Sequence, residues 1–266
     1  MDPLYAFFDD IVCINLSISG DRRIHSEGIF KSLGIPGRFF ITEKHENGGL
    51  YGCFDSHIKV IEEAYNNGVN NLLVFEDDFE PSKSYSREKL FKAIEFMSTS
   101  EEWDIFYLGY CFCFEAFNSG TTTVFSGKRL TKDIMQYNAG TTHTLCYSRR
   151  AMEKILKNYH DYIGIIHYDQ YLCDYIDLQN YCILPMIFQQ NLSFSYNIEA
   201  QHGFEIINRL FYPIDAYLNM NYNLSKIHYD LTTTTIHSRY YKYVFLIIIS
   251  ALLHIIKKSI IRRTLI

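Results

Sequence analysis

The sequence predicts an α/β protein built around a mainly parallel sheet. Over the first 110 residues, short apolar runs of strand-forming residues alternate with segments whose apolar residues recur at helical spacing. One apolar run leads directly into three acidic residues, as expected at the sheet edge where ligands bind. The chain has 266 residues, 48% hydrophobic and 21% charged, so it can bury a core. This composition excludes disordered, collagen-like and polytopic membrane proteins.

Each element has its own pattern. Short apolar runs predict strands at 10–16, 37–42, 71–75 and 104–110. Helical spacing predicts helices at 22–33, 53–67 and 85–97, and Gly34 and Pro36 end the first of them. Later in the chain we expect a loop or hairpin at 119–126, a strand at 141–147, a helix at 149–159, a helix at 170–177 and a strand-like run at 181–189 broken by Pro185. Residues 191–240 show no clear pattern.

The C-terminal segment differs in charge from the rest of the chain. From Arg239 onward there are six basic and no acidic residues, which leaves 19 basic against 30 acidic residues before it. We therefore expect no binding of nucleic acid through its phosphates. The apolar run 243–256 would form a helix of about 21 Å, short of a bilayer core of about 30 Å. We expect the tail to lie on a membrane surface; a helix packed on the protein's own core is the alternative.

The seven cysteines are odd in number and irregularly spaced, with no zinc-ribbon pattern. Several lie in apolar runs, so we expect reduced core residues rather than disulfides. The N-terminus has no basic segment followed by a long apolar stretch, as a signal peptide would. Together these features favour a cytoplasmic protein that is peripheral to a membrane.

The chemically most informative stretch is LLVFEDDFEP, residues 72–81, where an apolar strand delivers Glu76, Asp77 and Asp78. Adjacent carboxylates repel one another, so a cation or a basic partner is expected to neutralise them. Carboxylate oxygens suit Mg²⁺ or Mn²⁺, which bind through one or two carboxylates together with substrate phosphates. The stretch predicts a site for a metal ion and a nucleotide-sugar diphosphate; a solvated acidic turn is the alternative.

Residues 49–81 resemble the core signature of glycosyltransferase family 25, the lipopolysaccharide-type and collagen-type galactosyl- and glucosyltransferases. The matching residues, in order, are Gly52-Cys53, Ser56-His57, Gly68 and Glu76-Asp77-Asp78. Shorter similarities extend over residues 10–195 and include Asn15-Leu16, Asp21-Arg22-Arg23, Tyr168-Asp169 and Gln189-Gln190. Ser17 and Ile18 depart from the Asp-Arg usual in the family.

The resemblance implies one GT-A-like, Rossmann-type glycosyltransferase domain over 1–240, followed by the tail, 241–266. It implies transfer of galactose or glucose from a UDP-sugar to a glycan, lipid-linked or protein hydroxyl acceptor, with Mn²⁺ or Mg²⁺ as cofactor. It also implies an inverting mechanism, which needs a base to take the acceptor proton.

Candidate roles follow for individual residues. We expect Asp78 to bind the metal with help from Asp77, and Glu76 to face the nucleotide or sugar. Asp169 is the candidate base, with a helix N-cap as the alternative. The remaining candidates are Asn15 and Arg22 at the nucleotide end, Ser56 and His57 at a helix start near the donor, and His202 as a late metal ligand. His143 competes for that last role, but its strand pattern favours a packed side chain.

Three other functions remain open at this stage. A non-catalytic nucleotide-sugar- or carbohydrate-binding module would keep the fold without turnover. A metal-dependent phosphoesterase also uses acids at strand ends, but typically adds histidine ligands that the sequence does not show in a cluster. A membrane scaffold held by the tail would leave the acidic cluster unexplained.

Overall fold

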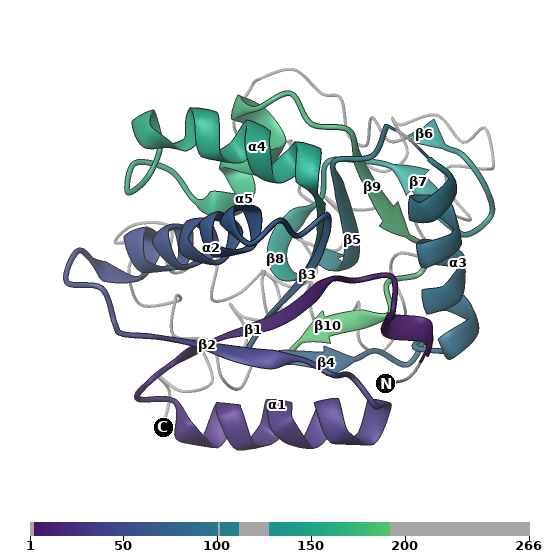
Figure 1. The fold of residues 1–266 in the computed structure, drawn as a ribbon, viewed down its shortest axis with the longest axis horizontal. Helices are drawn as coiled ribbons and strands as arrows, with labels where there is room; N and C mark the ends of the chain where they lie inside the picture. The colour runs from purple at the N-terminus through teal and green to yellow at the C-terminus, as the bar shows by residue number, and fades with distance from the viewer. Residues whose placement is uncertain (1–2, 101, 112–127, 192–266) are drawn as a thin grey trace, which may run out of the picture.

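The computed structural model describes residues 3–100, 102–111 and 128–191. The backbone forms an eight-stranded sheet in the order β2-β1-β3-β8-β5-β9-β7-β6, and a two-stranded sheet of β4 and β10 lies beside it. In Figure 1, α2, α4 and α5 lie on one side of the large sheet and α1 on the other. The expected α/β class is therefore confirmed.

The element bounds follow the chain. The strands are β1 (Asp10–Leu16), β2 (Arg38–Thr42), β3 (Asn71–Glu76), β4 (Phe79–Pro81), β5 (Ile105–Cys111), β6 (Lys128–Arg129), β7 (Ile134–Gln136), β8 (Gly140–Ser148), β9 (Asn180–Ile183) and β10 (Phe188–Gln190). The α-helices are α1 (Gly20–Leu33), α2 (Gly48–Asn66), α3 (Arg87–Thr99), α4 (Arg149–Asn158) and α5 (Tyr168–Gln170). A π-helical turn, Tyr171–Tyr175, continues α5.

Most strands of the large sheet point the same way. β1 pairs in parallel with both β2 and β3, and β5 pairs in parallel with β9. β8 is inserted antiparallel between β3 and β5, and β7 is antiparallel to both β9 and β6. The carboxyl ends of β1, β2 and β3 therefore meet at one edge of the sheet, where an α/β protein binds its ligand.

Alternate strand residues supply two hydrophobic cores. Val12 and Val74 face the core beneath α2 and α4, whereas Cys13 and Phe75 face the core formed with α1 and α3. The middle of β3 is fully buried on both faces, as its continuous apolar run predicts. The two cores hold these strands in place and so fix the positions of the polar residues at the strand ends.

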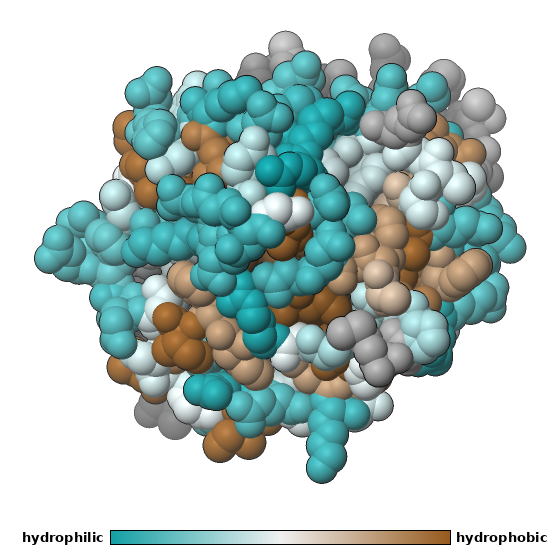
Figure 2. All heavy atoms as spheres, viewed as in Figure 1, coloured by the Kyte–Doolittle hydropathy of each residue, from teal (hydrophilic) through white to brown (hydrophobic). Residues whose placement is uncertain are grey.

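On the face seen in Figure 2, hydrophilic residues predominate and apolar surface gathers near the middle.

The expected elements within the described residues are present, with three differences. α2 begins at Gly48, five residues before the predicted start. The prediction started too late because Gly48 and Gly49 have low helix propensity, so the first turn shows no helical pattern. The helix expected at 170–177 is instead the short α5 and a π-helical turn ending at Tyr175. The strands β4, β6 and β7 were not predicted, because two or three residues are too few to show a period.

Some expectations concern residues outside the described ranges. These are the loop or hairpin at 119–126, the metal-ligand role of His202 and the tail at 241–266, so each stays a prediction. In the described part of the chain, no helix is both long and apolar enough to span a membrane. Five cysteines there are free thiols, and those at positions 13, 146 and 182 are buried, as expected of core residues.

Candidate active site

A cavity of about 340 Å³ lies at the carboxyl ends of β1, β2 and β3. The start of α2 forms part of its wall through Gly48, Gly49 and Gly52, and Arg22 from α1 adds a guanidinium. Glu76, Asp77 and Asp78 all line it. The structure thus brings the predicted acidic cluster into a cavity of the size that binds small molecules.

Asp77 is held by side chains from the first strand and helix. Asn15 Nδ2 donates to Asp77 Oδ2 at 2.7 Å, and Arg22 forms an ion pair with Asp77 Oδ1. Ser26 Oγ donates to the Asp77 carbonyl at 3.1 Å. Burial raises the pKa of Asp77, and the charge of Arg22 opposes that rise. Asn15 and Arg22, predicted to line the nucleotide end, therefore lie beside the acidic cluster, and Asp77 is bound on both oxygens.

Asp78 has a different environment. Its Oδ2 accepts a hydrogen bond from Gln190 Nε2 at 2.8 Å and lies 3.3 Å from a nitrogen of Arg22. Its Oδ1 is buried and has no hydrogen-bond partner among the described residues. Burial and the neighbouring charge of Glu76 raise the pKa of Asp78 to about 8. A buried, unpaired carboxylate oxygen is costly, and a bound cation would remove that cost.

Glu76 is oriented by two hydrogen bonds. Thr142 Oγ1 donates to Glu76 Oε1 at 2.5 Å, and His57 Nε2 lies 3.2 Å from the same oxygen. Burial alone would raise the pKa of Glu76, but the hydrogen bond and charge of His57 outweigh it and hold the pKa below its ordinary value. Glu76 is therefore a fixed carboxylate at the cavity wall.

A buried network holds His57 in turn. Its ring stacks on Tyr168 with centroids 4.6 Å apart, and its Nδ1 lies 3.4 Å from the Tyr147 hydroxyl. The Tyr168 hydroxyl donates to the Tyr147 hydroxyl at 3.3 Å. These contacts fix the orientation of the His57 ring beside Glu76.

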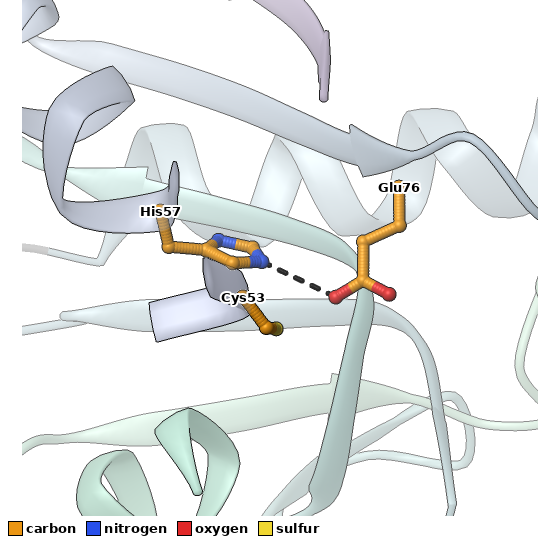
Figure 3. A group of neighbouring side chains, drawn as sticks. All are labelled: Cys53, His57 and Glu76. Carbon is orange, nitrogen blue, oxygen red and sulfur yellow. Dashed lines mark hydrogen bonds and ion pairs between the residues drawn. The ribbon is translucent and has the colours of Figure 1, made fainter. Parts of the chain in front are cut away.

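Cys53 completes a small group with His57 and Glu76, drawn in Figure 3. The Sγ of Cys53, a ring nitrogen of His57 and a carboxylate oxygen of Glu76 all lie within 4.8 Å of one another. Burial raises the pKa of the Cys53 thiol, and the carboxylates of Glu76 and Asp169 raise it further. Ser56, also a predicted donor residue, lines the cavity while its hydroxyl donates to the Gly52 carbonyl at 2.6 Å.

Asp169 does not line this cavity. Its Oδ2 accepts the backbone N–H of Thr141 at 3.0 Å, and its Oδ1 accepts that of Gln170 at 2.8 Å. Thr141 adopts a left-handed φ of 62°, which is unfavourable for a β-branched residue. Asp169 therefore stabilises the start of β8, and its role as base stays a prediction.

His143 is packed, as its strand pattern predicts. It is fully buried, and its Nδ1 lies 3.0 Å from Thr141 Oγ1. Burial lowers the pKa of His143 to about 4. The side chain is neutral at physiological pH and lies outside the cavity wall.

Sequence reasoning missed several residues of the site. Thr142 was missed because it lies within a run of strand-forming residues. Alternation along β8 places it on the side of the sheet opposite to His143. Ser26 was missed because a serine within a helical pattern does not by itself indicate a site residue. Lys44 and His45, which follow β2 in a loop of the cavity wall, were missed as well. Gln190 belonged to a similarity quoted above, but nothing in the sequence connected it with Asp78.

The chain was compared with known proteins. No family model matches it, and no curated protein matches it. A solved glycosyltransferase involved in the glycosylation of the major capsid of PBCV-1 shares 12% identity over 70% of this chain and 94% of that chain, with a TM-score of 0.41. Protein A197 from STIV shares 12% identity over 65% and 81%, with a TM-score of 0.38.

A third solved structure, mannose-1-phosphate geranyltransferase from Thermus thermophilus, shares 9% identity over 65% of this chain and 58% of that chain, with a TM-score of 0.31. All three similarities are remote.

Proposed function

We propose that the protein is a glycosyltransferase that uses a nucleotide-sugar donor. The observation that carries the proposal is Asp78, whose buried Oδ1 faces no hydrogen-bond donor among the described residues, in a cavity at the carboxyl ends of three parallel strands. Together with the family 25 resemblance of residues 49–81, this favours a metal-dependent, inverting, GT-A-like enzyme. The proposed reaction moves galactose or glucose from a UDP-sugar to a glycan, lipid-linked or protein hydroxyl.

The residues at this end of the cavity fit a hard divalent cation. Asp78, with Asp77 beside it, offers the carboxylate oxygens that Mn²⁺ and Mg²⁺ prefer. Such an ion, when bound, supplies positive charge to a departing diphosphate. Arg22 now contacts both acids, and we propose that it turns to the diphosphate when they bind a cation.

The other residues have positioning roles in this proposal. Glu76 faces the sugar or nucleotide with its orientation fixed by His57 and Thr142. Asn15 keeps Asp77 in place from the end of β1. Asp169 is the proposed base, and it would have to exchange a backbone hydrogen bond for the acceptor hydroxyl.

The first experiment measures UDP release by the full-length chain from a panel of UDP-sugars, with and without Mn²⁺. Mn²⁺-dependent release from one sugar is expected, and it would identify the donor. If no sugar gives release and UDP does not bind in the presence of Mn²⁺, the proposal is wrong.

Asp78→Asn should lower UDP release at least a hundredfold, because it removes the carboxylate proposed to bind the cation while keeping nearly the same shape. Circular dichroism should show an unchanged fold. The matched control is Asp55→Asn on α2, whose carboxylate pairs with Lys59 instead of lining the cavity. Normal turnover by Asp78→Asn would contradict the metal assignment.

Asp169→Asn should lower kcat by well over tenfold while the affinity for the donor is kept, because a base acts on the acceptor in the chemical step. If kcat is unchanged and only the free energy of unfolding falls, Asp169 has solely its observed structural role at Thr141. Steady-state kinetics and urea unfolding of the same variant separate the two results.

A second candidate is a nucleotide-sugar-binding module without catalysis. The observation that favours it is Arg22, which already supplies a cation to Asp77 and Asp78. Binding of UDP that is independent of Mn²⁺, with no release from any UDP-sugar, would favour this candidate over the enzyme.

A further inference from the structure

We propose that Cys53, His57 and Glu76 form a binding site for a thiophilic divalent cation such as Zn²⁺, distinct from the Asp77–Asp78 end of the same cavity. The sulfur, imidazole nitrogen and carboxylate oxygen that face one another in Figure 3 are the three ligand types of protein zinc sites. The site is a property of these side chains alone and does not depend on the proposed transferase activity.

The backbone places two of the ligands by helix periodicity. Cys53 and His57 are four residues apart on α2, so they project from the same face of the helix. Glu76 reaches them from the end of β3. The His57 Nε2–Glu76 Oε1 separation is 3.2 Å, close to the spacing of about 3.3 Å between neighbouring ligands that zinc bond lengths of about 2.0–2.1 Å imply. The Cys53 sulfur lies within 4.8 Å of both atoms.

Each of two ligands also has a partner that orients it. Thr142 donates to the Glu76 carboxylate, and the Tyr147 hydroxyl lies at hydrogen-bond distance from His57 Nδ1. Metal binding requires the His57 proton to leave Nε2, which now donates to the Glu76 carboxylate, and a hydrogen bond from Nδ1–H to the Tyr147 hydroxyl then holds the ring with Nε2 facing the metal. Outer partners of this kind commonly fix the tautomer and direction of metal ligands.

The chemistry of the site differs from that of its neighbours. A thiolate and an imidazole select softer cations, whereas the carboxylates of Asp77 and Asp78 suit Mn²⁺ or Mg²⁺. Binding forms a metal–sulfur bond as the Cys53 thiol releases its proton to the buffer, so affinity should rise with pH. Because the three ligands all line the cavity, the fourth coordination position remains for water or another small ligand.

Co²⁺ added to the full-length chain tests the proposal, since thiolate coordination to Co²⁺ produces a charge-transfer absorption that carboxylates and imidazoles do not. We expect this absorption in the wild-type protein and in Cys173→Ser, whose thiol lies on the π-helical turn after α5. We expect its loss in Cys53→Ser, with Zn²⁺ affinity at least tenfold weaker. Its absence from the wild type, or its persistence in Cys53→Ser, would overturn the proposal.

A measurement on the unaltered protein guards against misfolding of the variant. Iodoacetamide alkylation of Cys53, followed by peptide mass spectrometry, should slow at least tenfold when Zn²⁺ is added, because the metal occupies the sulfur. Alkylation of Cys173 in the same sample should keep its rate. Equal rates at Cys53 with and without Zn²⁺ would show that the sulfur binds no metal.

Discussion

His143 and Gly109 show how closely two residues approach across neighbouring strands. A Cβ on Gly109 would collide with the His143 imidazole and would lie 2.9 Å from the Phe188 carbonyl. The pair lies between β5, β8 and β10, so the contact also fixes the strand that brings Gln190 to Asp78. The absence of a side chain at position 109 is thus a packing requirement of the site's surroundings.

Gly109→Ala should lower the free energy of unfolding by about 1–3 kcal/mol, because the methyl group overpacks a rigid strand contact. Gly28→Ala is the matched control: its Cβ meets nothing within 4 Å on α1, so it should stabilise by about 0.5–1 kcal/mol. Urea unfolding measures both. A neutral Gly109→Ala would mean that His143 can move aside without cost.

His143 should also make the protein sensitive to acid. Its pKa falls from 6.5 to about 4 on folding because it is buried. Between these values the unfolded chain binds a proton that the folded chain does not, so stability falls as pH falls from 6.5 to 4. The full difference corresponds to about 3 kcal/mol.

Urea unfolding between pH 7 and pH 4 should therefore show a shallower loss of stability in His143→Asn than in the wild type. His160→Asn, which removes an exposed histidine, should keep the wild-type slope. Parallel slopes for all three proteins would show that folding does not change the pKa of His143.

At the scale of elements, the junction from β8 to α4 is set by one side chain. Ser148 ends the strand and caps the helix, and its Oγ accepts the Ala151 N–H at 3.1 Å. The same turn is tied to β5 through Asp104, whose carboxylate binds Arg150 and Lys154 at 2.7 and 2.9 Å. The cap and the ion pairs fix α4 over the sheet next to α2.

Ser148→Ala should lower the free energy of unfolding by about 1 kcal/mol, because it leaves a helix N–H without its acceptor. Ser32→Ala near the end of α1 provides the comparison, since its exposed hydroxyl only donates to the Ile29 carbonyl. That variant should remain within about 0.5 kcal/mol of the wild type by thermal or urea unfolding. A loss of similar size in both variants would contradict the capping role.

At the scale of the whole molecule, the sequence predicts the elements better than their arrangement. Apolar periodicity locates β1, β3 and α4 to within a residue or two, because burial sets both the pattern and the structure. The same periodicity does not reveal that β8 lies antiparallel between β3 and β5, since spatial order depends on contacts between distant segments.

The site follows the same division. Glu76, Asp77 and Asp78 were predicted because a strand and its acids are contiguous in the chain. Their partners Thr142 and Gln190 arrive from remote strands, so no local spacing marks them. Asp169 differs from these residues: its residue type suggests a base, whereas in the structure its two carboxylate oxygens accept backbone N–H groups.

The insertion of β8 has a consequence for how the protein is made. On the ribosome, β1, β2 and β3 can assemble soon after residue 76 emerges, but the free edge of β3 must wait for residues 140–148. At roughly 5–20 residues per second this delay lasts several seconds. During that time the nascent chain exposes an unpaired apolar strand, which is a template for association with other chains. The open edge of β3 should therefore make the chain more prone to aggregate during synthesis than after folding is complete.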